Sequence, residues 1–299
     1  MTVALLGVPT NSSGITDGVA LAPRALREAG LVPRLRRSPL VDLGEIQVDE
    51  PSPARGPDGI IDAVNLATTL ARVRAQTAAA IQLGHRVLLV GGDCPVLIGA
   101  LAGCADVAGT PPGVLFVDGH EDAWPPQAST TGEAADMELG LLLGRSIDGV
   151  EPSLRSQIPG LDPARVVILG ARDRAELDDA RVESLEGTVS LLDDAAVRAD
   201  PTAVAVEAVR RVASPASGWW LHVDLDVLSS DALPAVDYPQ DGGLSWLDLT
   251  TLTRSALSAG GCLGATVTIF NPDLDPDGRY ALDIVEFIDG LADGLEAKA

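Results

Sequence analysis

Two short acidic runs contain the side chains of this chain that could do chemistry. Asp118, His120 and Asp122 alternate in the first run, and Asp224 and Asp226 repeat this spacing later in the chain. Carboxylates and imidazoles at such spacing are typical ligands of hard or borderline divalent cations such as Mn²⁺. Five ligands are many for one ion, so the pattern predicts a two-metal cluster, whose ions lie roughly 3.5–4 Å apart and hold a bridging hydroxide.

Each acidic run directly follows an apolar segment of strand length, at 113–117 and 219–223. A parallel strand with two buried faces tolerates alternating acids only where they emerge at its carboxyl end and share a cation. Eight such apolar segments alternate with eight helical stretches, which favours an α/β fold with a parallel sheet covered on both faces. Sites in such sheets lie at the carboxyl ends of the strands, where both acidic runs are expected.

The expected elements and loops follow from this alternation. The strands are expected at 3–8, 40–43, 86–90, 113–117, 165–169, 188–192, 219–223 and 264–269. The helices are expected at 23–29, 61–83, 95–101, 134–143, 174–185, 201–212, 246–258 and 281–295. The Pro- and Asp-rich segments 47–59 and 231–243 are expected to be loops, and the second should line the site. Nothing marks a boundary, so we predict one domain over residues 1–299.

Composition limits the partners and the compartment. The chain has 299 residues, 46% of them hydrophobic, which suffices for a large core. Its net charge of −22 argues against nucleic acid and anionic membranes as partners. The three scattered cysteines, with no recognisable signal peptide and no apolar run of ~18 residues, favour a reducing cytoplasm. The excess of arginine over lysine favours a GC-rich bacterial genome.

A family resemblance rests on three motifs in a fixed order. They resemble those of the arginase/agmatinase (ureohydrolase) family, and they are Gly91-Gly92-Asp93-Cys94-Pro95, Asp118-Gly119-His120-Glu121-Asp122 and Asp224-Leu225-Asp226. The resemblance implies a three-layer α/β/α sandwich around an eight-stranded parallel sheet. It also implies two Mn²⁺ ions, hydrolysis of a C–N bond in a small guanidino or formimino compound, and a homo-oligomer of three or six subunits.

The resemblance also assigns metal ligands, four to each ion. They would be Cys94, Asp118, Asp122 and Asp224 for one ion, and His120, Asp118, Asp224 and Asp226 for the other. Asp118 and Asp224 would bridge the two ions. Asp122 would also accept a hydrogen bond from the hydroxide, which would make it a catalytic residue.

Cys94 departs from the family pattern, which has histidine there. A thiolate is softer than imidazole and favours Zn²⁺ or Fe²⁺ over Mn²⁺. The ion must also displace the thiol proton. We favour ligation over the alternative of a small buried cysteine beside a half-vacant site, because Cys94 still follows a Gly-Gly turn after a strand.

Ile269 is the second departure, because the family has a glutamate there that pairs with the substrate guanidinium. Isoleucine cannot neutralise a cation, and losing a charge partner in a closed site weakens binding. A free guanidinium substrate such as arginine or agmatine is therefore disfavoured.

A third departure follows the first acidic run. Trp124, Glu133 and Ala135 replace two asparagines and a histidine of the arginine-cleaving members. Trp124 would supply an apolar wall, and Glu133 could bind a hydrogen-bond donor or act as general acid or base if burial raises its pKa. Alternatively, Glu133 only stabilises the start of the helix at 134–143. With Thr131 and Ile269, Trp124 and Glu133 are the expected substrate contacts.

Two further polar residues have structural alternatives. His222 could hydrogen-bond a ligand carboxylate, or it could be a satisfied core histidine. Asp93 is expected to orient the backbone or Cys94 rather than to bind metal.

These observations favour a metal-dependent hydrolase of a non-peptide C–N bond in an amidine, modified guanidine, formimino or linear amide group. In it Asp122 steers the nucleophile, and Glu133 or solvent protonates the leaving amine. One alternative is hydrolysis of an N-hydroxylated arginine in a biosynthetic pathway, where lower basicity makes the missing glutamate less costly. Another is a non-catalytic scaffold, which Cys94, Ala135 and Ile269 favour and the five retained ligands oppose.

Overall fold

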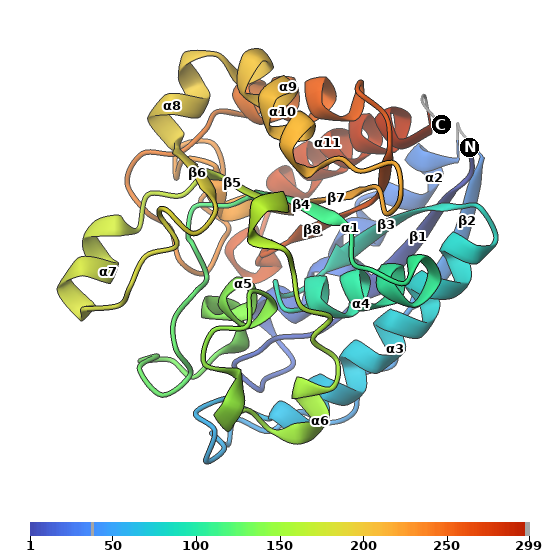
Figure 1. Ribbon diagram of the computed structural model, residues 1–299. Coiled ribbons are helices and arrows are strands. Elements are labelled where there is room, and N and C mark those ends of the chain that lie inside the picture. The colour runs from blue at the N-terminus through green and yellow to red at the C-terminus, as the bar shows by residue number, and fades with distance from the viewer. Residues whose placement is uncertain (37–38, 297–299) are drawn as a thin grey trace.

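The computed structural model describes residues 1–36 and 39–296, so the last residues of the expected 1–299 domain lie outside the described part. Eight strands form one parallel sheet in the order β2-β1-β3-β8-β7-β4-β5-β6 (Figure 1). The strands are β1 (Val3–Val8), β2 (Leu40–Glu45), β3 (Arg86–Gly91), β4 (Gly113–Val117), β5 (Val166–Gly170), β6 (Ser190–Asp193), β7 (Trp219–Asp224) and β8 (Cys262–Thr268). Each overlaps its predicted segment.

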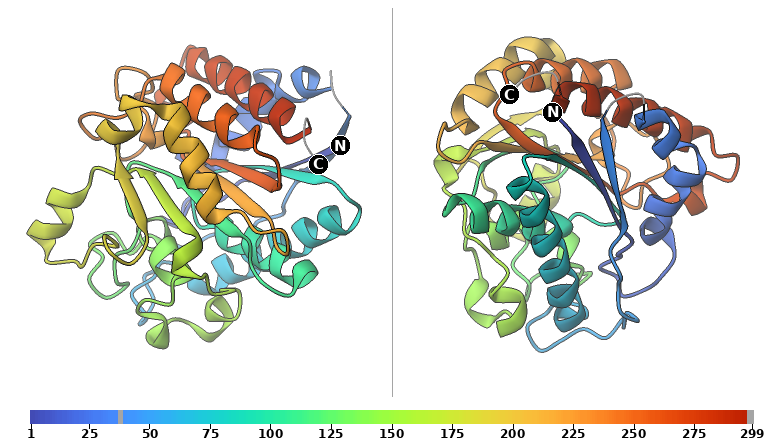
Figure 2. Two further views of the ribbon diagram at one scale, coloured as in Figure 1. Left: turned by 45° about the horizontal axis from the view of Figure 1, so that its top comes forward. Right: turned by 90° about the vertical axis from the view of Figure 1, so that its right-hand side faces the viewer.

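Helices cover both faces of the sheet, which gives three layers (Figures 1 and 2). One core contains residues of α1 (Ala22–Glu28), α2 (Leu31–Leu35), α8 (Asp194–Ala199), α9 (Pro201–Val212), α10 (Trp246–Leu257) and α11 (Arg279–Glu296). The other contains residues of α3 (Ala63–Gln82), α4 (Val96–Ala108), α5 (Glu138–Leu142) and α6 (Pro152–Arg155). A further helix, α7 (Arg174–Ala180), follows β5. The predicted α/β/α sandwich is confirmed. In the described part of the chain, no helix is long and apolar enough to cross a membrane.

The central strands are buried on both sides, as their unbroken apolar sequences predict. In β3, Leu88 and Val90 belong to one core while Val87 and Leu89 belong to the other. Every residue of β4 and β7 is buried. The acidic side chains therefore lie at the strand ends, whereas His222 is a buried polar residue within β7.

Several helix boundaries differ from the prediction. The predicted helix 134–143 is a 3₁₀ turn at Ala134–Asp136 followed by α5, because Met137 between them has a φ of −140°. The helix predicted at 174–185 ends at Ala180, since Arg181 adopts a left-handed φ of 58°. Helices α2, α6 and α8 were not predicted. They have five, four and six residues, too few to show a periodic pattern.

Gly92 joins three strand ends next to the predicted ligands. Its N–H donates to the carbonyl of Val8 at 2.8 Å, and its own carbonyl accepts from the N–H of Ile269 at 2.8 Å. A Cβ on Gly92 would lie 2.0 Å from the carbonyl oxygen of Thr10 and 2.8 Å from that of Val19. Only glycine therefore allows β1, β3 and β8 to end this close together.

We expect Gly92→Ala to lower the free energy of unfolding by about 2–3 kcal/mol, because backbone atoms must move to admit the methyl group. Gly290→Ala in α11 is the matched control: its Cβ would meet nothing within 4 Å, and alanine favours the helix by roughly 0.5–1 kcal/mol. Chemical denaturation of both variants measures the difference. Equal stability of the two would contradict the close packing at Gly92.

Candidate metal centre

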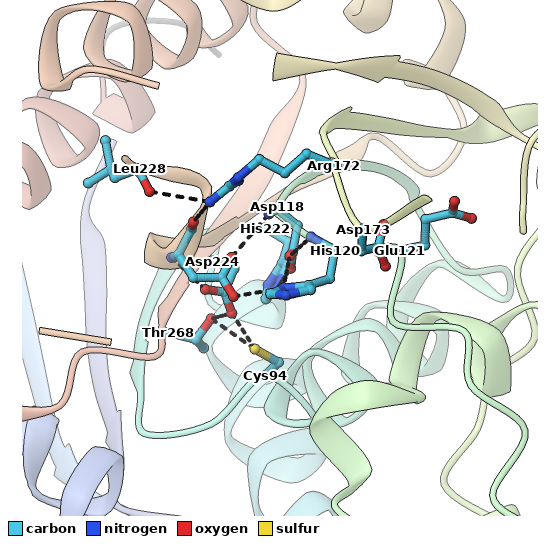
Figure 3. A network of polar contacts seen from close by, with 12 residues as sticks. Cys94, Asp118, His120, Glu121, Arg172, Asp173, His222, Asp224, Leu228 and Thr268 are labelled. Carbon is cyan, nitrogen blue, oxygen red and sulfur yellow. Dashed lines mark hydrogen bonds and ion pairs between the residues drawn. The ribbon is translucent and has the colours of Figure 1, made fainter. Parts of the chain in front are cut away.

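Four adjacent strands bring the candidate ligands to one place at the centre of the sheet edge. Cys94 follows β3, Asp224 ends β7 with Asp226 just beyond, and Asp118 follows β4; β8 lies between β3 and β7. Figure 3 shows these side chains converging from elements far apart in the sequence. Topology alone thus produces the cluster that the two acidic runs predicted.

Asp118 lies at the bottom of the cluster and is fully buried. Its Oδ1 accepts the backbone N–H of His120 at 2.7 Å, whereas its Oδ2 has no hydrogen-bond partner among the described residues. The Nε2 of His222 is 3.9 Å from that oxygen and also lacks a partner. A buried carboxylate oxygen left in this state is costly unless a cation neutralises it.

His120 connects the two acidic runs. Its Nδ1 lies 2.9 Å from Oδ2 of Asp226 and 3.7 Å from Oδ1 of Asp118. The other oxygen of Asp226 accepts the N–H of Gly119 at 3.0 Å, and Oδ1 of Asp224 accepts the N–H of Asp226 at 2.8 Å. The two runs therefore form one compact group, with one oxygen of each of these two aspartates fixed by the backbone.

Cys94 reaches the same group from the opposite side. Its Sγ donates to Oδ2 of Asp224 and lies 3.6 Å from the hydroxyl of Thr268. Asp93 accepts the N–H of Cys94 at 2.9 Å through Oδ1 and the N–H of Ser12 at 2.6 Å through Oδ2. Asp93 thus orients the turn that presents Cys94, as the sequence predicted.

The remaining acid of the first run points elsewhere. Figure 3 shows Glu121 directed away from the cluster, and its carboxylate accepts the hydroxyl of Ser184 at 2.7 Å and the N–H of Leu185. Arginine does not replace the cation either. Arg172 donates to the backbone carbonyl of Asp226 at 2.7 Å, and it makes no ion pair with a cluster carboxylate among the described residues.

Burial and mutual repulsion dominate the electrostatics. Burial, then the charge of Asp226, raises the pKa of Asp118 to about 6. Burial and neighbouring carboxylates raise the pKa values of Asp122 and Asp224 well above the usual range. Burial lowers the pKa of His120, but the charges of Asp226 and Asp118 outweigh it and raise that pKa well above its usual value. The cluster therefore takes up protons wherever no other cation compensates it.

Three overlapping sets of side chains each bring ligand atoms within 4.8 Å of one another. They are Asp118, His120 and Asp122; Asp118, Asp224 and Asp226; and Cys94, Asp118, Glu138 and His222. Every predicted ligand belongs to one of these sets, and Asp118 belongs to all three. Oxygen and nitrogen donors at this density fit two divalent ions.

Two residues of the cluster have strained backbones. Asp122 has a φ of 43° and Ile269 a φ of 71°. A positive φ is uncommon for aspartate and a clear outlier for a β-branched residue, costing on the order of 1–3 kcal/mol. Such strain persists where the surrounding structure imposes it, and at Ile269 the bond from its N–H to Gly92 does so.

A cavity of about 310 Å³ opens directly above the cluster. Its walls include the four predicted substrate contacts Trp124, Thr131, Glu133 and Ile269. Asp118 is the only predicted ligand that does not line it, because that residue lies beneath the floor. The loop 231–243 also borders the cavity, as predicted, through Asp237, Tyr238, Pro239 and Gln240.

Glu133 does not act as a helix cap. Its side chain makes no capping bond to the 3₁₀ turn that follows it, and its Oε2 instead accepts the hydroxyl of Tyr238 at 2.9 Å across the cavity. Burial, then the charge of Asp93, raises the pKa of Glu133 to about 7. Of the two readings of Glu133 from sequence, this geometry favours the functional one.

Sequence reasoning missed three residues of the site. Glu138 is fully buried at the start of α5, where its carboxyl group lies against that of Asp122. Tyr238 and Asp237 lie in a loop that was expected to line the site, but their positions needed the fold. The sequence signal for Glu138 was its position as an acidic residue inside the otherwise apolar stretch Met137–Leu143, because acids are rarely buried without a partner.

Comparison with known proteins agrees with this geometry. The Arginase family model matches residues 1–291. The arginase of Bacillus caldovelox is 27% identical over 296 residues, covering 97% of each chain. Its crystal structure superposes with a TM-score of 0.83 at 28% identity, covering 99% of this chain and 98% of the other. The N(omega)-hydroxy-L-arginine amidinohydrolase of Streptomyces lavendulae is 28% identical, covering 98% of this chain and 95% of the relative.

The family model spans nearly the whole chain, and the two relatives match it from end to end. These matches confirm the resemblance seen in the sequence. The chain belongs to the arginase family, and it is a hydrolase that acts on carbon–nitrogen bonds other than peptide bonds.

Proposed function

We propose that this enzyme hydrolyses an amidino-type C–N bond in a small molecule that has a weakly basic reacting group and no carboxylate. The observation that carries the proposal is the charge of the cavity. Its lining includes seven carboxylates, namely those of Asp122, Glu133, Asp136, Glu176, Asp224, Asp226 and Asp237, and no lysine or arginine among the described residues.

The chain's own donors fit a pair of divalent ions. The residues that would hold them are Cys94, Asp118, His120, Asp122, Asp224 and Asp226. Two such ions supply hydroxide at neutral pH and stabilise negative charge that develops on the substrate. The unpartnered Oδ2 of Asp118 and the raised pKa values of Asp122 and Asp224 support this assignment, because they mark anions that need a cation.

Asp122 and Glu133 have separate roles in the proposed reaction. Asp122 is buried but borders the cavity, where its carboxylate would accept a hydrogen bond from the attacking water and orient it. Glu133 is half-buried on the opposite wall, and a pKa of about 7 leaves a proton available for the leaving amine. Tyr238 fixes one oxygen of Glu133, so the other oxygen is free to face the substrate.

The reacting end of the substrate is expected to be weakly basic. Ile269 is buried in the cavity wall at the position where the family places a guanidinium-pairing glutamate. An apolar side chain offers no compensation for a full positive charge. N-hydroxylated guanidines, amidines and formimino groups meet this condition better than arginine does.

The other end of the substrate meets an acidic entrance. A hollow of about 460 Å³ adjoins the cavity and shares Glu133, Asp237 and Tyr238 with it. It adds Asp17, Asp93 and Asp273 and no basic side chain among the described residues. A substrate carboxylate there would face only like charges, whereas an ammonium group would be attracted.

An N-hydroxyarginine-type reaction is the second candidate, because the Streptomyces lavendulae relative has that activity in its name. N-hydroxyarginine has the weakly basic reacting group that we propose for the substrate, but it also has a carboxylate, which the proposed substrate lacks. The location in the cytoplasm and the assembly into trimers or hexamers stay predictions.

The two candidates are separated by a matched pair of substrates. We expect kcat/KM to be at least about tenfold higher for N-hydroxyagmatine than for N-hydroxyarginine, because the acidic entrance repels the carboxylate of N-hydroxyarginine. A repulsion of ~1.4 kcal/mol in the transition state suffices for this ratio. Urea or hydroxyurea release measures both. Asp17→Asn should reduce the ratio of the two kcat/KM values, whereas Asp148→Asn, at a site outside the cavity, should leave this ratio unchanged. A preference for N-hydroxyarginine or for arginine would refute the proposal that the natural substrate has no carboxylate.

The pH dependence tests the role of Glu133. A carboxyl group donates a proton only below its pKa, so kcat/KM should fall as the pH rises through about 7. The hydrogen bond from Tyr238 lowers the pKa of Glu133, so Tyr238→Phe should move this fall to higher pH. Glu133→Gln should reduce kcat by about 10²–10⁴. Superimposable pH profiles for the wild type and Tyr238→Phe would exclude Glu133 as the proton donor.

A further inference from the structure

At and beneath the cavity floor, four fully or nearly fully buried side chains face one another, and of these Cys94 also lines the cavity. One ligand atom from each of Cys94, Asp118, Glu138 and His222 lies within 4.8 Å of all the others. Two of these residues, Glu138 and His222, are absent from the ligand set that the family resemblance assigns. The group is therefore distinct from the family's pair of sites, although it shares Cys94 and Asp118 with them.

We propose that Cys94, Asp118, Glu138 and His222 form a deep four-ligand site for one borderline divalent ion such as Zn²⁺ or Fe²⁺. This ion would replace the one that the family resemblance places between Cys94, Asp118, Asp122 and Asp224. The inference rests on the proposed metal dependence, but it does not depend on which C–N bond is cleaved.

Glu138 is the first observation behind this site. Its residue is 0% exposed, and the groups within hydrogen-bonding reach of its carboxyl group are its own backbone and another acid, the carboxyl group of Asp122. The surrounding charges are themselves carboxylates, chiefly Asp118. An acid in this position is destabilising by several kcal/mol unless a cation or proton compensates it.

His222 is the second observation, independent of the first. Its ring stacks on Phe116 with centroids 4.7 Å apart, and its Nδ1 is 2.7 Å from the hydroxyl of Thr266. When Nδ1–H donates to that hydroxyl, Nε2 carries a lone pair directed toward the cluster. Buried metal-binding histidines are commonly oriented in this way, with one nitrogen fixed by a protein oxygen and the other on the ion.

The unpartnered atoms belong to one place. Nε2 of His222 and Oδ2 of Asp118 are 3.9 Å apart and both lack partners among the described residues, and the carboxyl group of Glu138 beside them faces other acids, Asp118 and Asp122. A proton shared between Glu138 and a neighbouring carboxylate would satisfy Glu138 alone. A single cation would satisfy all three residues, together with the sulfur of Cys94.

The donor types specify the ion. One sulfur, one imidazole nitrogen and two carboxylate oxygens make a four-coordinate set of the kind that Zn²⁺ adopts. Mn²⁺ prefers oxygen-rich ligand sets, and His120, Asp224 and Asp226 remain available for it on the cavity side. The chain would then distinguish its two metal positions by ligand softness, with Asp118 common to both.

Cobalt(II) substitution of the full-length protein reports on the sulfur ligand directly. We expect Co²⁺ to give a thiolate-to-cobalt charge-transfer band and the intense visible bands of four-coordinate cobalt. Cys94→Ser should abolish the charge-transfer band, whereas Cys104→Ser, at a buried thiol outside the cluster, should retain it. Circular dichroism confirms that each variant is folded.

Two isosteric variants decide between the deep site and the family position. Glu138→Gln should weaken Co²⁺ and Zn²⁺ binding at the thiolate site at least tenfold, while Asp122→Asn should leave the charge-transfer band in place. The reverse pattern, with the band lost in Asp122→Asn and kept at unchanged affinity in Glu138→Gln, would overturn the inference. Absence of the band in the wild type at saturating Co²⁺ would also overturn it.

The spectroscopic result is independent of turnover. A wild type with the band but without hydrolysis of any amidino substrate would refute the proposed function and leave the deep site standing. Metal-dependent hydrolysis with unaltered metal binding in Glu138→Gln would refute the deep site and leave the function standing.

Discussion

The structure depends on cancelling the charge of carboxylates held in a dry crevice. Asp118, Asp122, Asp224 and Asp226 lie at neighbouring strand ends, and all are buried. Burial and neighbouring carboxylates raise the pKa values of Asp118, Asp122 and Asp224, whereas at Asp226 the charge of His120 outweighs burial and lowers the pKa. Backbone N–H groups satisfy only some of the carboxylate oxygens. Divalent cations are the compensation that fits this geometry, because Arg172 hydrogen-bonds a backbone carbonyl and its charge helps to lower the pKa of Asp226 only, while the pKa values of Asp118, Asp122 and Asp224 stay raised.

The fold makes this concentration of charge possible by keeping it out of the strands. The strands β3, β4 and β7 are largely apolar, with His222 as the buried polar residue inside β7, and their side chains belong to two continuous cores that hold the strand ends in fixed positions. Gly92 lets three of these ends approach closely, and the strained backbones of Asp122 and Ile269 are maintained by the same rigidity. The stability of the cores therefore compensates both the strain and the repulsion at the site.

The sequence predicted what depends on local pattern. Unbroken apolar runs indicated all eight strands, and the alternation of Asp118, His120 and Asp122 indicated ligands at a strand end. It did not predict what depends on contacts between distant segments. Glu138 occupies an apolar helical stretch that reads as core, and its relation to Cys94 and His222 exists only once α5 packs beneath the sheet edge. Tyr238 meets Glu133 across the cavity, a contact that no spacing encodes.

The departures from the family pattern are connected through charge. With Glu138 among the ligands, five carboxylates and the thiolate of Cys94 outnumber the four positive charges that two divalent ions bring. A further glutamate at position 269 would add to this excess in the same small volume, so an apolar Ile269 is the electrostatically consistent partner of Cys94 and Glu138. The remaining negative charge extends to the entrance through Glu133, Asp237 and Asp17. Under the two proposals, the same imbalance would require tightly held cations below and would select against anionic groups on the substrate above.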